Sequence, residues 1–357
     1  MKKYLLTVMA VAGLVSCSNE TDSFNTADPN EIRVAAQTID ASTKAPLDSK
    51  TSSFRAMVLT SSTSGDYTTL YAPNAGKYMD FTDQTTKKGF VDAEGADSKQ
   101  YYPTSTATQQ EVYISGLMPA AASTSDESSK SDIWKYDAGN LSITFDGNDD
   151  VMIAQEATAR KGTDASLSFN HLLTQLVVKV QASVGDPEVW GNITKIVLKN
   201  VGGKTGKIYN QFAITGTELK SGTATVSTTA EAASEAVKFY NASASGSATS
   251  FTDTEYSGTN NSVLKSSQST ATTVAYMLCQ AFNVKQTPGD TDLVLDVYTT
   301  RNSSTPKTVE IDLTSASELN TAGYAFEITL DFQTNEIMAS AKIADWKEGG
   351  NGTGVID

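Results

Sequence analysis

Residues 326–332 read Phe-Glu-Ile-Thr-Leu-Asp-Phe, and this stretch decides the fold class. Apolar and polar residues alternate strictly through it, so one face carries Phe326, Ile328, Leu330 and Phe332. A period of two is typical of a half-buried β-strand, whereas an amphipathic helix repeats its apolar residues every three or four positions. The stretch therefore predicts a strand with one face in a hydrophobic core.

Similar runs of alternating or β-branched residues recur on both sides of this stretch. They lie at 54–59, 111–114, 141–145, 176–180, 193–198, 293–298, 308–313 and 337–343. Turn-forming residues separate many of them, and the best helix candidate, residues 230–237, is weak. This pattern predicts an all-β protein of antiparallel sandwiches. The 357 residues suit two sandwiches, which we place at 45–160 and 161–357.

Composition and missing motifs exclude several functional classes. The chain has 27 basic and 41 acidic residues, a formal net charge of −14, so nucleic acid is not an expected partner. His171 is the single histidine, which excludes metal sites built from several histidines. The Asp-Gly-Asn-Asp-Asp run at 146–150 could bind calcium, but its spacing favours a solvated turn. Phosphate-loop, dinucleotide and nucleophile-elbow motifs are absent, so we expect no enzyme, no metal and no cofactor.

The first sixteen residues predict a signal peptide. Lys2 and Lys3 precede a short apolar run that is too short to span a bilayer. The run ends in Leu14-Val15-Ser16-Cys17, which resembles a bacterial lipobox and predicts lipid on Cys17. The polar residues 18–30 are expected to form a tether. The other cysteine, Cys279, lies in an apolar run and is expected to be buried and inert.

A strand is predicted after the tether, at residues 31–42. Ile32, Val34 and Ala36 alternate on one of its faces. Thr43-Lys44-Ala45-Pro46 follows as a polar break. The segment 17–44 is therefore expected to hold a lipidated tether and one N-terminal strand.

Three motifs carry a resemblance to a known family. Phe169 and His171 lie in Phe169-Asn170-His171-Leu172-Leu173, which resembles the F-x-H-x-L motif of fimbrillin-like lipoproteins of Bacteroidales-type bacteria, the type V pilus subunits. Asp150 to Ala154 resembles the D-x-[LM]-x-A element of that family. Ile343 to Gly350, which includes Trp346, resembles its terminal I-x-x-W-x-x-G-G signature. With the lipobox, the resemblance covers essentially the whole chain.

The resemblance implies a fold, a location and an assembly mechanism. The fold is a pair of transthyretin-like β-sandwiches. The protein would be a fimbrial subunit that supports adhesion, exported as an outer-membrane lipoprotein and then found in an extracellular fimbrium. Its partners would be other fimbrial subunits, with a host or bacterial surface ligand in addition. A trypsin-like protease would remove the N-terminal strand and open a groove for a strand of a neighbouring subunit.

The sequence leaves the processing site and the donated strand open. Cleavage is expected between Lys44 and Ala45, with Arg33 as the less favoured site, and an anchor subunit would remain uncut. The expected donor is the segment 336–357. It offers alternating apolar residues at Ile337, Ala339, Ala341 and Ile343, and a second apolar pair at Val355 and Ile356. Alternatively, residues 337–343 close their own sandwich, and only 350–357 or nothing is donated.

Two further expectations concern His171 and a competing function. His171 sits among apolar residues and is expected to orient the first strand of the second sandwich through a hydrogen bond.

The competing function is a surface lipoprotein that binds glycans beside a nutrient transporter. Such sites display clustered aromatic residues, whereas Trp134, Trp190 and Trp346 are scattered and Tyr101-Tyr102 is the only pair of adjacent tyrosines.

Overall fold

The protein is almost entirely β-structure. The computed structural model describes residues 28, 30–38, 54–68, 78–81, 87–92, 95–103, 111–118, 134–137, 140–148, 150–162, 165–182, 190–224, 226–229, 231–232, 236–241, 270–284, 289–313 and 319–344. Strands dominate this part of the chain, and its α-helix has six residues. The all-β prediction is confirmed.

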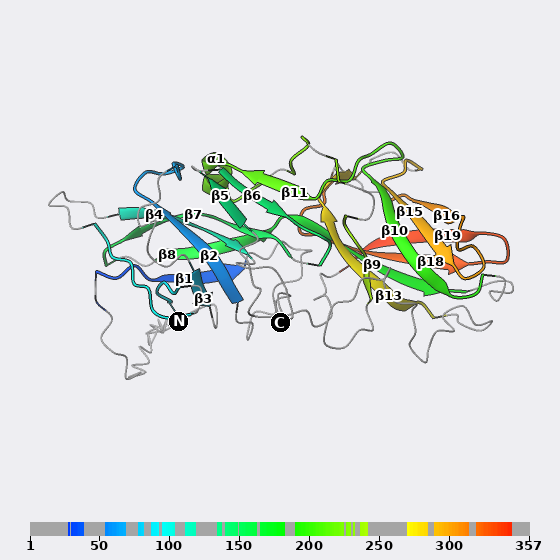
Figure 1. Cartoon of the computed structure of the whole chain (residues 1–357), viewed down its shortest axis with the longest axis horizontal. Helices are drawn as coiled ribbons and strands as arrows, with labels where there is room; N and C mark the ends of the chain where they lie inside the picture. Colours follow the sequence, from blue (N-terminus) through cyan, green and yellow to red (C-terminus); the bar gives the residue numbers. More distant parts are fainter. Residues whose placement is uncertain are drawn as a thin grey trace, which may run out of the picture.

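The first lobe is built on a six-stranded sheet in the order β1-β8-β7-β4-β2-β3 (Figure 1). Its strands are β1 (Val34–Thr38), β2 (Phe54–Ser61), β3 (Tyr78–Phe81), β4 (Glu111–Met118), β7 (Met152–Arg160) and β8 (Ala165–His171). A three-stranded sheet covers one face of it in the order β11-β6-β5. Those strands are β5 (Trp134–Asp137), β6 (Asn140–Thr144) and β11 (Gln211–Ile214), followed by the helix α1 (Gly216–Ser221).

The second lobe pairs a five-stranded sheet, β12-β13-β9-β18-β19, with a three-stranded sheet, β10-β15-β16. The larger sheet contains β9 (Leu173–Gln181), β12 (Tyr240–Asn241), β13 (Thr272–Gln280), β18 (Ala325–Phe332) and β19 (Ile337–Ala344). The smaller contains β10 (Ile193–Val201), β15 (Leu293–Thr299) and β16 (Lys307–Ile311). A short ribbon pairs β14 (Asn283–Val284) with β17 (Leu319–Asn320).

One hydrophobic cluster runs through both lobes. It joins Leu59 and Ile153 of the six-stranded sheet in the first lobe to Val178 and Leu330 of the five-stranded sheet in the second lobe. The alternating residues of β18 belong to this cluster, and Phe326, Ile328, Leu330 and Phe332 are all fully buried. The periodicity in the sequence therefore reports burial on this strand correctly.

The change from one lobe to the other lies later than the predicted boundary at 160/161. Strand β8 belongs to the first sheet and β9 to the second, and only Leu172 separates them. The chain then returns to the first lobe, where β11 pairs with β6. Residues 165–181 contain no glycine or proline, so the sequence carries no turn signal at the point where the chain passes between the sheets.

The helix also differs from the weak prediction at 230–237. It is α1, and the described residues around 231–237 are not helical. The Glu218 carboxylate accepts the backbone N–H of Thr215 at 2.7 Å, and Gly222 ends the helix with a φ of 67°. A capping residue at each end and one buried leucine, Leu219, therefore define this short helix. Within the described residues, no helix has the length and apolar character needed to cross a bilayer.

Candidate functional site: the N-terminal strand and its groove

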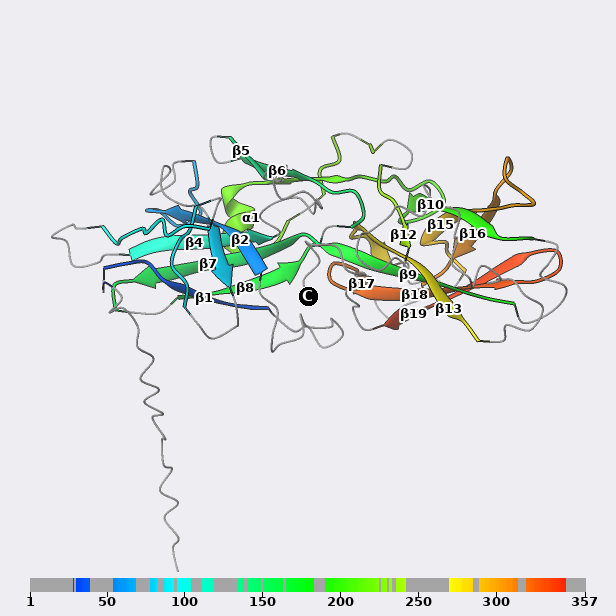
Figure 2. The same cartoon turned by 60° about the horizontal axis from the view of Figure 1, so that its bottom comes forward.

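Strand β1 is the first strand of the described chain, and it lies parallel to β8 (Figure 2). All five of its residues are in register with β8, from Val34 opposite Ala165 to Thr38 opposite Phe169. The other pairings in this sheet are antiparallel. As the first strand of the described chain, β1 can leave the sheet without unthreading any other described strand.

The inward residues of β1 and of the segment just before it are fully buried, as the sequence predicts. Ile32, Val34 and Ala36 have no exposed surface, and they pack into a cluster with Leu167 and Phe169 of β8. Burying a large aliphatic side chain contributes roughly 1.5–3 kcal/mol, and an alanine contributes less. Removing β1 therefore leaves an apolar trough beside β8.

A second wall holds β1 on its other side. Residues 87–92 and 95–103, the described parts of the wall segment 87–103, donate and accept backbone hydrogen bonds along residues 30–34. The N–H of Ile32 donates to the carbonyl of Gln100 at 2.8 Å, and Val34 exchanges two bonds with Lys88, at 2.9 and 3.0 Å. The same segment reaches β3, because Val91 exchanges two bonds with Tyr78. The first lobe is thus closed across its edge strands: the wall bonds residues 30–34, β8 pairs with residues 34–38, and Val34 has partners on both sides.

The polar face of this N-terminal strand is also enclosed. The Glu31 side chain is only 6% exposed, and its carboxylate lies 4.0 Å from the ammonium of Lys99. Gly89 makes room for it, since a Cβ there would lie 2.4 Å from Glu31 Oε1. The groove therefore provides a carboxylate position next to its apolar trough.

Arg33 lies inside this paired region. Its neighbours Ile32 and Val34 are fully buried, and the Val34 N–H, which belongs to the bond after Arg33, donates to Lys88. A protease must open the strand to reach that bond. Lys44 and Ala45 lie outside the described residues.

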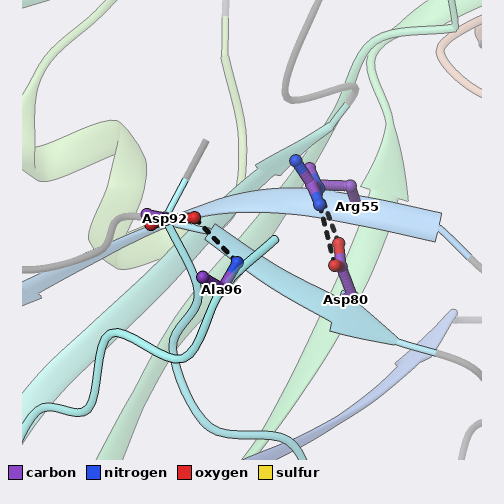
Figure 3. A network of polar contacts seen from close by, with 4 residues as sticks. All are labelled: Arg55, Asp80, Asp92 and Ala96. Carbon is purple, nitrogen blue, oxygen red and sulfur yellow. Dashed lines mark hydrogen bonds and ion pairs between the residues drawn. The ribbon is translucent and has the colours of Figure 1, made fainter. Parts of the chain in front are cut away.

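Figure 3 shows polar contacts of β2, β3 and the wall segment. Arg55 of β2 donates two hydrogen bonds to the carboxylate of Asp80 on β3, at 2.6 and 2.8 Å. These bonds raise the pKa of the guanidinium, which stays charged. Asp92 accepts the backbone N–H of Ala96 at 2.8 Å and closes a turn within the wall segment 87–103. The wall is therefore held in place by its own turn and by β3.

His171 ends β8 next to the point where the chain enters the second lobe. Its Nδ1 lies 2.7 Å from Oδ2 of Asp150, and both side chains are buried. Asp150 lies just before β7, and the Leu172 N–H donates to the Val151 carbonyl at 2.8 Å. His171 thus joins the start of β7 to the end of β8 in the first lobe. The sequence had instead predicted it on the first strand of the second sandwich. Phe169, two residues earlier, is buried against Gly116, where a Cβ would lie 2.8 Å from the ring.

The predicted donor residues of β19 lie in the second lobe. β19 pairs antiparallel with β18 along its full length, from Ile337 opposite Phe332 to Ala344 opposite Ala325. Ile337, Ala339 and Ala341 are partly buried against the core, while Ile343 is 46% exposed. Here residues 337–344 close their own sheet. Cys17, Trp346, Val355 and Ile356 lie outside the described residues.

The remaining candidate residues have structural contacts. Asp146 accepts the hydroxyl of Tyr240 at 2.7 Å and the N–H of Asn148 at 3.0 Å. Among the described residues, no three metal-ligating side chains gather. Trp190 is buried and donates to the Gln333 carbonyl, whereas Tyr101 is 43% exposed. Cys279 is fully buried, which raises the pKa of its thiol.

Comparisons with known proteins add solved structures of similar shape. A candidate cell adhesion protein from Bacteroides uniformis is 15% identical, with a TM-score of 0.48 over 89% of this chain and 98% of its own. A fimbrial protein from Bacteroides vulgatus is 14% identical, with a TM-score of 0.38 over 89% and 100%. The fimbrial anchor protein Mfa2 from Porphyromonas gingivalis is 11% identical, with a TM-score of 0.38 over 88% and 97%. The sequence matches no protein-family model and no curated protein.

Proposed function

We propose that this protein is a structural subunit of a cell-surface fimbria and that it polymerises by strand exchange. Proteolysis after Lys44 frees the segment 17–44, which carries β1. A strand from the C-terminal part of a neighbouring subunit then enters the vacated groove. The role is the one that the sequence resemblance implies, and it supports adhesion at the bacterial surface.

The groove around β1 is the observation that carries this proposal. An empty groove would expose the backbone of β8 and the wall segment 87–103 together with an apolar trough. Unpaired strand edges bind other strands, with main-chain hydrogen bonds supplying affinity and alternate side chains supplying register. A strand of matching pattern from another copy satisfies both needs.

The signal peptide and Cys17 supply the route to the surface. Cleavage before Cys17 and acylation of its thiol would hold the precursor at the outer membrane until processing. Removal of residues 17–44 would then release the subunit from its lipid as it opens the groove. One cut thereby couples release to assembly.

Limited trypsin digestion of the purified chain tests the proposal. We expect the cut protein to form multimers that survive SDS without heating and dissociate on boiling, while the uncut chain stays monomeric. Lys44→Ala together with Lys50→Ala, which removes both lysines between β1 and β2, should abolish the ladder, whereas Lys50→Ala alone should leave it intact. Ladders from the uncut chain, or from the double variant with residues 17–44 still attached, would contradict strand removal as the trigger.

A further inference from the structure

The turn 145–148 belongs to the first lobe but takes its hydrogen-bond partners from the second. It follows β6 directly, in the Asp-Gly-Asn run whose spacing did not suit calcium. The Asp146 carbonyl accepts the N–H of Lys238, two residues before β12, at 2.7 Å. The Gly147 carbonyl accepts the N–H of Leu278, within β13, at 2.8 Å. Two successive carbonyls of the first lobe are therefore bonded to two strands of the second.

These bonds cover an open edge of β13. β12 pairs with β13 only at Ala275 and Tyr276, whereas β13 continues to Gln280. Beyond that short pairing, Gly147 is the backbone partner of Leu278 on the side away from β9. Leu278 is 4% exposed, so opening the turn would leave a buried N–H without this partner, which costs free energy.

Two tyrosines of the second lobe hold the side chains of the same turn. The Tyr240 hydroxyl donates to Oδ2 of Asp146 at 2.7 Å, and the Tyr276 hydroxyl donates to Oδ1 of Asn148 at 3.1 Å. The two rings stack, with their centroids 6.0 Å apart. Both tyrosines and Asn148 are buried. Oδ1 of Asp146 also accepts the Asn148 N–H at 3.0 Å, which fixes the shape of the turn.

Gly147 is required at the point of closest approach. Its φ is 111°, a value that residues with a Cβ rarely adopt. A Cβ there would also lie 2.4 Å from the Lys238 carbonyl oxygen and 3.0 Å from the Lys238 nitrogen. A larger residue would therefore push the turn away from the second lobe.

Gln280, at the end of β13, adds a contact with the chain that returns to the first lobe. Its Nε2 donates to the Lys207 carbonyl at 2.9 Å, and its Oε1 accepts the Tyr209 N–H. Two residues later β11 begins, and β11 pairs with β6. Both β6 and β11 are therefore tied to β13 at their junction with the second lobe.

We propose that residues 145–148, the interlobe clamp, hold the two lobes as one rigid body, and that the chain bends at Leu172 when the clamp opens. Leu172 is the single residue between β8 of the first lobe and β9 of the second. The shared apolar cluster holds the lobes together, but apolar contact is non-directional and allows sliding. Hydrogen bonds depend on distance and angle, so the clamp fixes the orientation. This inference goes beyond the proposed function and does not rest on it.

Pulsed electron resonance between two spin labels tests the clamp in the uncut chain. The labels are attached at Ser166→Cys on β8 and Ser340→Cys on β19, both exposed positions, in a Cys17→Ala background. Cys279 is fully buried and stays unlabelled. We expect one narrow distribution of distances between the lobes. A broad distribution in this parent chain would already overturn the proposal.

Gly147→Ala should open the clamp and broaden the distribution about twofold. Gly162→Ala is the matched control, because Gly162 also has a positive φ, 79°, but an added Cβ there would have nothing within 4 Å. It should leave the distribution narrow. Circular dichroism checks that each variant is folded.

Tyr240→Phe combined with Tyr276→Phe keeps the backbone of the clamp and removes both hydroxyl contacts. This variant should broaden the distribution in the same direction but by less, and it decides the test if Gly147→Ala does not fold. Tyr298→Phe changes a tyrosine outside the clamp in the same lobe and should match the parent. Folded clamp variants whose distributions are as narrow as those of the two controls would overturn the proposal.

Discussion

The buried contact between His171 and Asp150 gives His171 a structural role. Histidine in an apolar run is expected to have a polar partner, and the structure places Oδ2 of Asp150 2.7 Å from its Nδ1. The sequence did not identify Asp150 as that partner, because the two residues meet only when β7 and β8 pair. Equally, the alternation of Ile32, Val34 and Ala36 predicted their shared burial, but not the wall segment 87–103 that completes it.

We expect His171→Ala to lower the free energy of unfolding by about 1–3 kcal/mol, because it leaves the buried Asp150 carboxylate without this partner. Urea denaturation followed by circular dichroism measures the change. Ser166→Ala, at an exposed position of the same strand, is the control and should stay within about 0.5 kcal/mol of the parent. A parent-like midpoint for His171→Ala would show that the contact does not stabilise the fold.

At the scale of elements, the sequence predicted where strands lie in the chain far better than which strands pair with one another. The strand at 326–332 has the predicted buried face, since its period of two is local information. The boundary between lobes and the return of β11 to the first lobe depend on pairings between distant strands, which no local pattern encodes. The helix α1 carried a readable signal in Thr215 and Glu218, a capping pair, but its single turn and a half gave too few apolar positions to show a period.

Three strands of the second lobe meet at one carboxylate, and their stability should depend on pH. Burial alone would raise the pKa of Glu327, but hydrogen bonds from Lys179 of β9 and Lys342 of β19 outweigh it and hold the pKa below 4.5. A lowered carboxylate pKa adds stability above 4.5 that is lost as the pH falls through the folded-state pKa. The unfolding free energy should therefore decrease on acidification below about pH 4.5, and less steeply in Glu327→Gln.

Urea titrations of both proteins between about pH 3 and 7 measure this difference. Asp290→Asn changes an exposed carboxylate and should keep the slope of the parent protein. Equal slopes for the parent and Glu327→Gln would show that the three-strand contact contributes no pH-dependent stability.

At the scale of the whole molecule, the first lobe is closed by β1 and the wall segment, and the second lobe is closed by β19. Both are terminal strands of the described chain. Composition and periodicity could not predict this arrangement, because it follows from where the two strands lie in the finished fold.

A reversible lock on β1 tests the central claim most directly. Ala35 and Ser166 are register partners, so Ala35→Cys with Ser166→Cys, in a Cys17→Ala background, should form a disulfide within one chain. After trypsin cleavage the oxidised protein should keep its N-terminal strand and stay monomeric on an unheated SDS gel. Adding reductant should release the strand and start the heat-sensitive ladder. A ladder that forms equally well while the disulfide is intact would contradict exchange at the β1 groove.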